Sequence, residues 1–278
     1  MSYETVPANL SSLNQRCNNL ERNDQLSVTR RQNQMALVVV GQMLPGGVAK
    51  GGSAMAMRYG EAARFTSDFD ASRRLTEAEF TEAFAMNLEE GWCGFTGVLK
   101  ERPKPAPRGV PAEYVMVPYD IKLRFKGKSW KTVKFELGPD EIGASDVEEQ
   151  AMSDDLKELF TTLGFPAPDP VKVLRAENQI AQKIHAATAA GSERAHDLVD
   201  LQLLDANEDI DYALVKRLCV RTFAHRRAHA WPPELVPGEA WETVYRAAAE
   251  EVGAGSNVRE LADAIVWAEG LIHKIDNA

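Results

Sequence analysis

The sequence of 278 residues is 44% hydrophobic and 26% charged, which is typical of a globular protein with room for one large domain or two modest ones. A net charge of −9 argues against a protein whose whole surface wraps nucleic acid, although a local basic patch can still bind a phosphate backbone. Three widely spaced cysteines and the lack of a long apolar run argue against a disulfide scaffold and a membrane partner, so we expect a cytoplasmic protein.

A glycine turn follows the first apolar stretch of the chain. Residues 35–44 predict a buried helix or strand, and Gly51 and Gly52 then allow a sharp bend and the close approach of a ligand. Ser53 stands at the N-terminus of a short predicted helix, where N–H groups and the helix dipole favour an anion such as phosphate. The turn provides half of what a nucleotide site needs.

Two aspartates provide the other half. If residues 65–71 form a strand, its alternation places Asp68 and Asp70 on one face and Phe69 on the other. Two neighbouring carboxylates repel each other unless a cation lies between them, and carboxylate oxygens suit magnesium. The plain alternative is a solvated strand edge, but the glycine turn one short helix away favours a magnesium and nucleotide site.

The order of these residues resembles the signature of the AbiEii/AbiGii family of nucleotidyltransferase toxins, which includes the MenT-like toxins of type IV toxin-antitoxin systems. The family pattern is a Gly-Gly-Ser/Thr turn, a short helix ending near Tyr-Gly, an Arg, a Ser or Thr, and Asp-x-Asp. The matching residues are Gly51, Gly52, Ser53, Tyr59, Gly60, Arg64, Thr66, Asp68 and Asp70. The resemblance implies an α+β fold, with a polymerase-beta-like nucleotidyltransferase domain of mixed sheet and helices followed by a C-terminal helical domain.

Strand patterns follow this motif. A capping box of Thr76 and Glu79 opens a helix predicted over residues 76–91. Alternating residues then predict three strands, at 94–102, 113–127 and 129–141, with a hairpin turn at 126–128 and a proline-rich loop at 103–111.

The resemblance implies a third carboxylate on a strand beside the Asp-x-Asp strand. Glu136 is the candidate, because it alternates with the apolar Phe135 and Leu137 and can face a metal while they pack on the core. Asp120 is the competitor, and a solvent-facing strand charge is the plain alternative for both.

A second domain is expected where helical periodicity returns, so the predicted domains are residues 1–145 and 146–278. A helix is predicted over 147–163. The family's later motif is a helical Lys-Leu-His-Ala followed by Arg-Asp-x-x-Asp-Leu, and the matching residues are Lys183, Ile184, His185, Ala186, Asp197, Leu198, Asp200 and Leu201. His196 stands where the family usually has Arg, so one phosphate or charge contact is in question.

The resemblance implies that Lys183 and Asp197 contribute to the site from this second domain. A triphosphate beside two metals still carries negative charge, which a lysine on a rigid helix can neutralise. Asp197 would orient Lys183 or contact the nucleotide, whereas Asp200 could instead be a carboxylate favoured by a helix dipole. A solvated helix lysine is the plain alternative for Lys183.

One basic cluster stands out in this acidic chain, within residues 214–231. It is either a solvated helix face or a docking surface for RNA, with Trp231 or Phe223 available for base stacking. Its RNA-binding candidates are Arg221, Arg226 and Arg227.

Together these features predict a magnesium-dependent nucleotidyltransferase that uses a nucleoside triphosphate and two metal ions. Asp68, Asp70 and Glu136 would bind metal, and the nucleotide-binding residues would be Gly51, Gly52, Ser53, Arg64, Thr66, Lys183 and Asp197. The resemblance implies a toxin that serves in phage defence, is paired with an antitoxin and modifies the tRNA 3′ end to block translation; we expect a monomer. The alternatives are a nucleotide-binding regulatory protein, or transfer to a protein or a small molecule.

Overall fold

The computed structural model describes residues 2–21, 28–105, 115–252 and 258–278, and it divides into two compact units. The first unit comprises Met1–Glu61, Phe65–Glu141 and Glu148–Val173, and the second comprises Ala62–Arg64, Ile142–Val147 and Leu174–Ala278. The main break therefore falls after residue 173 rather than at 146. Residues 148–173 belong to the first unit because they contribute two strands to its sheet.

The first unit contains a mixed sheet, which within the described residues has seven strands in the order β3-β4-β5-β2-β1-β7-β6. The strands are β1 (Gly47–Lys50), β2 (Asp68–Arg73), β3 (Phe95–Glu101), β4 (Val117–Phe125), β5 (Lys128–Pro139), β6 (Glu148–Ala151) and β7 (Val171–Leu174). Strand β2 lies between β1, with which it is antiparallel, and β5, with which it is parallel. The predicted hairpin joins β4 to β5, where Lys126 and Gly127 both have positive φ.

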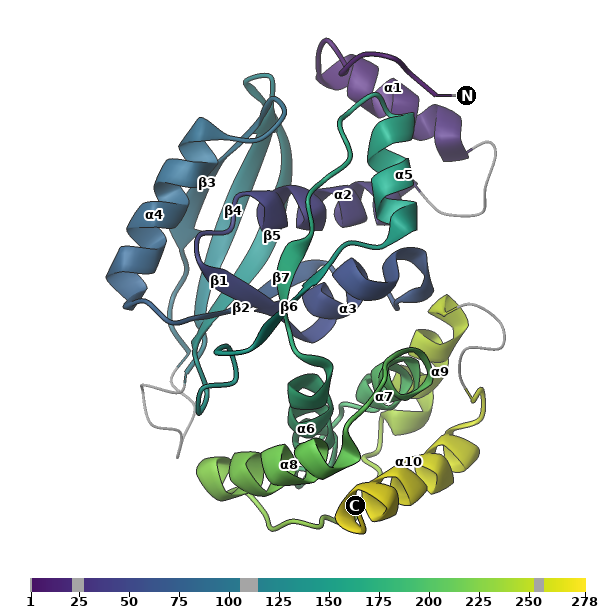
Figure 1. Cartoon of the computed structure of the whole chain (residues 1–278). Helices are drawn as coiled ribbons and strands as arrows, with labels where there is room; N and C mark the ends of the chain where they lie inside the picture. The colour runs from purple at the N-terminus through teal and green to yellow at the C-terminus, as the bar shows by residue number, and fades with distance from the viewer. Residues whose placement is uncertain (1, 22–27, 106–114, 253–257) are drawn as a thin grey trace. The chain divides into compact units, whose positions relative to one another are not determined.

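Five helices and one short 3-10 turn accompany the strands in the part of this unit that the structure describes (Figure 1). They are α1 (Leu10–Glu21), α2 (Val28–Gln42), α3 (Gly51–Tyr59), η1 (Gly60–Ala62), α4 (Glu77–Glu90) and α5 (Asp154–Thr162). The apolar stretch at 35–44 lies largely in α2, and the capping box of Thr76 and Glu79 is confirmed at the start of α4.

The helix expected over residues 147–163 is only partly present. Its first residues form β6 instead, and α5 begins at Asp154. Glu148 accepts from Arg74 at 2.5 Å and from Lys172 at 2.7 Å, so side-chain pairing and the neighbouring strand hold this acidic segment extended. Residues 106–111 of the predicted proline-rich loop lie outside the described residues.

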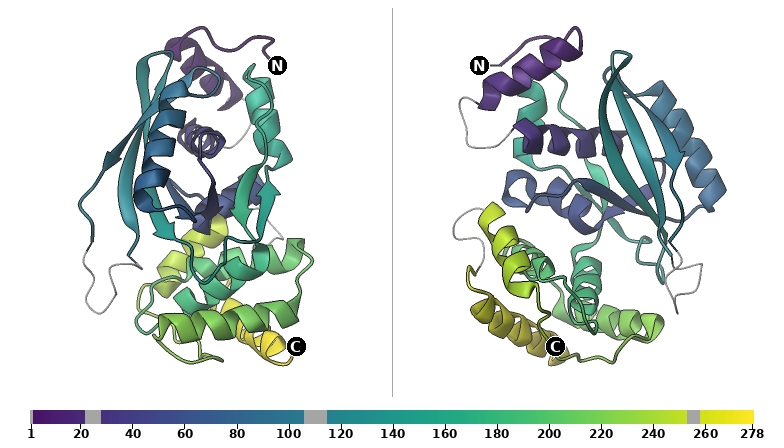
Figure 2. Two further views of the ribbon diagram at one scale, coloured as in Figure 1. Left: turned by 60° about the vertical axis from the view of Figure 1, so that its left-hand side comes forward. Right: turned by 180° about the vertical axis from the view of Figure 1, so that it is seen from behind.

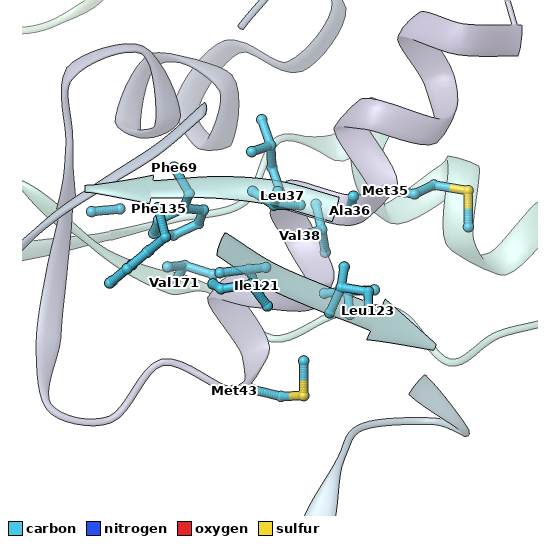
Figure 3. Close-up of a cluster of buried hydrophobic side chains, with 14 of the residues drawn as sticks. Met35, Ala36, Leu37, Val38, Met43, Phe69, Ile121, Leu123, Phe135 and Val171 are labelled. Atoms are coloured by element: carbon cyan, nitrogen blue, oxygen red, sulfur yellow. The ribbon is translucent and has the colours of Figure 1, made fainter. Parts of the chain in front are cut away.

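The core of this unit lies on one face of the sheet. Side chains of α2, among them Leu37 and Val38, lie among those of β2, β4 and β5 (Figure 3). Phe80 and Phe84 of α4 contact Phe135 of β5, with ring centroids 6.3 and 5.2 Å apart. Helices α2 and α4 therefore cover the face that carries the aromatic residues, and the polar residues that alternate with them point to the opposite face.

The second unit is helical in the part that the structure describes (Figure 2). Its helices are α6 (Ala176–Ala187), α7 (His196–Asn207), α8 (Tyr212–Arg226), α9 (Trp241–Glu251) and α10 (Leu261–Asp276). Helix α6 packs against α7 and α8, with Ile180, Ile184 and Leu198 fully or almost fully buried. No described helix of either unit is both long and apolar enough to cross a bilayer.

Candidate active site

The two predicted aspartates lie on β2, beside the predicted glutamate on β5. Asp70 is in register with Glu136, and Phe69 is in register with Phe135. The two phenylalanines are fully buried with ring centroids 6.0 Å apart, so the sheet's alternation places Asp68, Asp70 and Glu136 together on the other face. We call this the carboxylate face.

The competitor Asp120 stands one strand farther away. It lies on β4, opposite Lys134 of β5, and its carboxylate is 3.7 Å from Nε of Arg102. Glu136, by contrast, is the direct neighbour of Asp70. The register therefore favours Glu136 over Asp120 as the partner of the two aspartates.

The glycine turn lies directly against these carboxylates. Gly51 has φ of +57°, and a Cβ added there would be 2.5 Å from Oδ2 of Asp70. A Cβ on Gly52 would be 2.9 Å from Oγ1 of Thr66. Gly51 requires glycine because of its positive φ and its closeness to Asp70, whereas a side chain at Gly52 would force the side chain of Thr66 to shift.

Ser53 binds the strand that carries the aspartates. Its side chain is fully buried, and its hydroxyl donates to the carbonyl of Asp68 at 3.1 Å and accepts from the N–H of Asp70 at 2.8 Å. Because this hydroxyl is engaged with β2, the groups that the turn presents to an anion are the N–H groups of the first turn of α3, which have no acceptor within the helix. The N-cap residue, Lys50, makes no side-chain cap.

Two further hydroxyls contact Asp68. Thr66 donates to its carbonyl at 3.4 Å, and Ser67 donates to its Oδ1 at 2.9 Å. Thr66 thus supports the strand. Ser67, which the motif did not single out, orients one carboxylate, and its position next to Asp68 in the sequence was the only available signal.

The carboxylate face fits a hard divalent cation by the type and placement of its donors. Asp68, Asp70 and Glu136 are all partly exposed, and carboxylate oxygens are the ligands that magnesium prefers. Among the residues that the structure describes, no three Asp, Glu, His or Cys side chains converge as a closed metal cluster. The three carboxylates therefore share a face and a register without already surrounding one point.

The later motif forms a buried charge network within the second unit. Nζ of Lys183 is 3.0 Å from Oδ1 of Asp197 and 2.5 Å from Oδ2 of Asp200. Arg64 donates to both oxygens of Asp200 at 3.1 to 3.2 Å. Nε of Arg194 is 2.6 Å from Oδ2 of Asp197. Both carboxylates are fully buried and Lys183 is 4% exposed, so these three charges stabilise one another away from water, whereas the side chain of Arg194 is 49% exposed and reaches Asp197 from the surface.

The network contains more positive than negative charge. Burial alone would raise the pKa of Asp197, but the charges of Lys183 and Arg194 hold it well below its usual range. Burial opposes the charge of Arg64, yet Asp200 and Asp197 raise its pKa overall. Three cations thus meet two carboxylates, and the additional positive charge is that of Arg194, whose side chain is half-exposed.

His196 does not replace the family's arginine as a cation. Burial lowers its pKa to about 4, so it is neutral at pH 7. Arg194 contacts Asp197 instead, from three residues earlier in the chain. Sequence reasoning missed Arg194 because it compared only the residue that immediately precedes the aspartate. It also left Asp200 as a dipole-stabilised carboxylate, whereas Arg64 and Lys183 share it.

Some arginines of the basic cluster on α8 already make contacts within the second unit. Arg221 is exposed and donates to the carbonyl of Ile142 at 2.9 Å, and Arg226 is 3.3 Å from Nδ1 of His185. Arg227 is exposed at the left-handed end of the helix. Phe223 is buried against the rings of His185, His229 and Trp231, so it is not available for the expected base stacking.

Two solved structures are among those similar to this chain. The chain resembles MenT4, a nucleotidyltransferase toxin from Mycobacterium tuberculosis H37Rv, with a TM-score of 0.54 and 16% identity over 87% of this chain and 84% of that one. Its likeness to JHP933 from Helicobacter pylori has a TM-score of 0.44 and 12% identity over 88% and 90% of the two chains. Among curated proteins, none matches the sequence.

The first of these likenesses supports the nucleotidyltransferase fold. The family assignment comes from the sequence itself, because the profile described as "Nucleotidyl transferase AbiEii toxin, Type IV TA system" matches residues 48–265. That range includes the glycine turn, the carboxylate face and the whole charge network. The chain therefore belongs to the AbiEii family of nucleotidyltransferase toxins of type IV toxin-antitoxin systems.

Proposed function

We propose that this toxin transfers a nucleotide from a nucleoside triphosphate to the 3′ end of tRNA in a magnesium-dependent reaction that blocks translation. The observation that supports the proposal most directly is the register of Asp70 with Glu136 on the neighbouring strand. An antitoxin follows from the family, and an RNA acceptor would place the reaction in the cytoplasm. We expect the protein to act as a monomer in phage defence.

Asp68, Asp70 and Glu136 would hold the metal ions. A bound divalent cation supplies activation of the attacking hydroxyl and neutralises the leaving pyrophosphate. The backbone N–H groups from Gly51 onward would bind phosphate oxygens. Ser53 and Thr66 would act on the nucleotide indirectly, by fixing β2 through its backbone.

Arg64, Lys183 and Asp197 would serve the same reaction through the excess positive charge of their network. A triphosphate carries more negative charge than its metal ions neutralise, and fixed cations in a buried network need no reorganisation to stabilise it. Asp197 holds Lys183 and Arg194 in place, which is a positioning role. Arg221, Arg226 and Arg227 remain the candidates for contacts with the RNA backbone.

Labelling of RNA tests the proposal. Purified protein is incubated with total RNA, magnesium and each of the four labelled nucleoside triphosphates in turn. The variant is Asp70→Asn, and the matched control is Asp120→Asn, which removes the same charge one strand farther from β2. We expect label in tRNA with the unaltered protein and with Asp120→Asn, but not with Asp70→Asn.

Other outcomes would redirect the search. Label in a protein or small molecule instead of RNA would overturn the acceptor and retain the chemistry. Nucleotide binding without transfer to any acceptor would favour a regulatory protein. Full labelling by Asp70→Asn would contradict the assignment of the carboxylate face.

A further inference from the structure

Lys50 lies on the carboxylate face. It is the last residue of β1 and stands opposite Asp70 in the antiparallel pair of β1 and β2. Directly opposed residues of such a pair project to the same side of a sheet. Because Asp70 is in turn in register with Glu136, the lysine and the two carboxylates form one row across three neighbouring strands.

The side chain of Lys50 crosses the middle strand of this row. Its Nζ is 3.4 Å from Sδ of Met116 and 2.9 Å from the position that a Cβ on Gly138 would occupy. Gly138 lies on β5, two residues after Glu136, and β2 separates β5 from β1. The lysine therefore passes over β2 on the side from which Asp70 projects, and its ammonium ends on the strand of Glu136.

Gly138 provides the space that the ammonium occupies. An added Cβ there would be 2.6 Å from Sδ of Met116 as well as 2.9 Å from Nζ of Lys50. Gly138 is not among the glycines with positive φ, so its backbone does not itself require glycine. An alanine at this position would displace the ends of two flexible side chains rather than strain the main chain.

We propose that Lys50 is a positioning residue whose ammonium is the counter-charge of Asp70 and Glu136 before a divalent cation binds. The inference rests on the proposed function, since that assigns cation binding to these carboxylates. Adjacent carboxylates repel each other when no cation is present. A flexible lysine stem lets the ammonium withdraw when a divalent ion arrives, so Lys50 competes with the metal for the same charges.

Thermal unfolding without metal provides the first test. Lys50→Met, Asp70→Asn and the double variant are melted in the presence of a chelator, with Lys122→Met as the control for loss of an exposed strand lysine. We expect Lys50→Met to lower Tm by about 3 °C when Asp70 is intact and by much less when Asp70 is Asn. An equal loss in both backgrounds would overturn the inference, because it would mean that the lysine stabilises only by packing on Met116.

Binding of Mn²⁺ alone, followed by electron paramagnetic resonance, provides the second test. We expect Lys50→Met to bind Mn²⁺ about threefold to tenfold more tightly than the unaltered protein, as loss of one partly screened charge predicts. Lys50→Arg should bind as the unaltered protein does, and Gly138→Ala should shift towards Lys50→Met because it displaces the ammonium. Equal or weaker binding by Lys50→Met would overturn the inference.

The RNA labelling assay on the same preparations separates the two proposals. Charge coupling between Lys50 and Asp70 without labelling of RNA would support the role of Lys50 and contradict tRNA transfer. Labelling that depends on Asp70, without any coupling to Lys50, would overturn the role of Lys50 and leave the proposed function standing.

Discussion

The carboxylate face and the charge network use the same residue types in opposite ways. Asp68, Asp70 and Glu136 are partly exposed, whereas Asp197 and Asp200 are fully buried among Arg64, Lys183 and Arg194. A buried carboxylate held by fixed cations has its charge satisfied within the chain, while a partly exposed one on a strand can still take an external ligand. Burial therefore separates acidic residues that are open to an external ligand from those whose charges are paired within the chain.

The largest predicted effect breaks the charge network. Asp200→Asn leaves Lys183 and Arg64 without the carboxylate they share, and loss of one member of a buried ion pair costs about 3–5 kcal/mol. Urea unfolding should show this loss, with Asp120→Asn, a partly exposed carboxylate, as the control at less than about 1 kcal/mol. A loss for Asp200→Asn no larger than that of the control would mean that the network is not structural.

The next effect concerns the carboxylate face, where function rather than stability should suffer. Asp70→Asn should lower the rate of nucleotide transfer more than about a hundredfold, because a metal ligand is lost, with little change in unfolding free energy. Transfer rates and urea unfolding measured on one preparation would check this. If Asp70→Asn lost stability in proportion to activity, the carboxylate face would not differ from the charge network in its contribution to stability.

Acid should weaken the second unit through His196. Burial lowers the pKa of His196 in the folded chain to about 4 from its ordinary value of 6.5, so the unfolded chain binds the proton more readily. The stability that this histidine confers is complete above about pH 6.5 and is lost as the pH falls towards 4, by roughly 2 kcal/mol. His196→Gln should flatten this part of the curve of unfolding free energy against pH. If the unaltered protein and His196→Gln gave curves of identical slope, groups other than His196 would cause the loss of stability in acid.

The smallest effect tests the hydroxyl that joins α3 to β2. Ser53→Ala removes an acceptor from the N–H of Asp70 and a donor from the carbonyl of Asp68, which should cost about 1–2 kcal/mol. Ser67→Ala, at an exposed residue, is the matched control and should change stability by less than about 0.5 kcal/mol. Equal unfolding midpoints for the two variants would mean that the hydrogen bonds of Ser53 to β2 do not stabilise the protein.

Local rules predicted much of the first unit and little of the long-range pairing. Alternation correctly separated Phe69 from its flanking aspartates, and the capping box correctly began a helix at Thr76, because both signals lie within a few residues. The strand at Glu148–Ala151 was missed because Glu148 is held by Arg74 and Lys172, which are distant in the sequence. Helical periodicity instead predicted that this segment begins an amphipathic helix.

The candidate site shows the same limit. The family resemblance singled out Lys183 and Asp197, yet the contact of Arg64 with Asp200 spans 136 residues and no local pattern encodes it. The prediction that Phe223 could stack on a base was wrong. Its aromatic side chain suggested that role, but the rings of His185 and His229 pack against it and help to bury it. Lys50 was overlooked because its relation to Asp70 exists only in the sheet register.

The hydroxyl of Ser53 links the start of α3 to β2 through hydrogen bonds to the backbone of Asp68 and Asp70. A phosphate that binds the first N–H groups of α3 would shift the start of this helix, and the Ser53 hydroxyl would transmit the shift to the backbone of Asp68 and Asp70. Thermodynamic reciprocity then requires that whatever nucleotide binding does to the affinity for the cation, the cation does equally to the affinity for nucleotide. Nucleotide and metal would therefore bind cooperatively. Ser53→Ala should reduce this cooperativity while both ligands still bind.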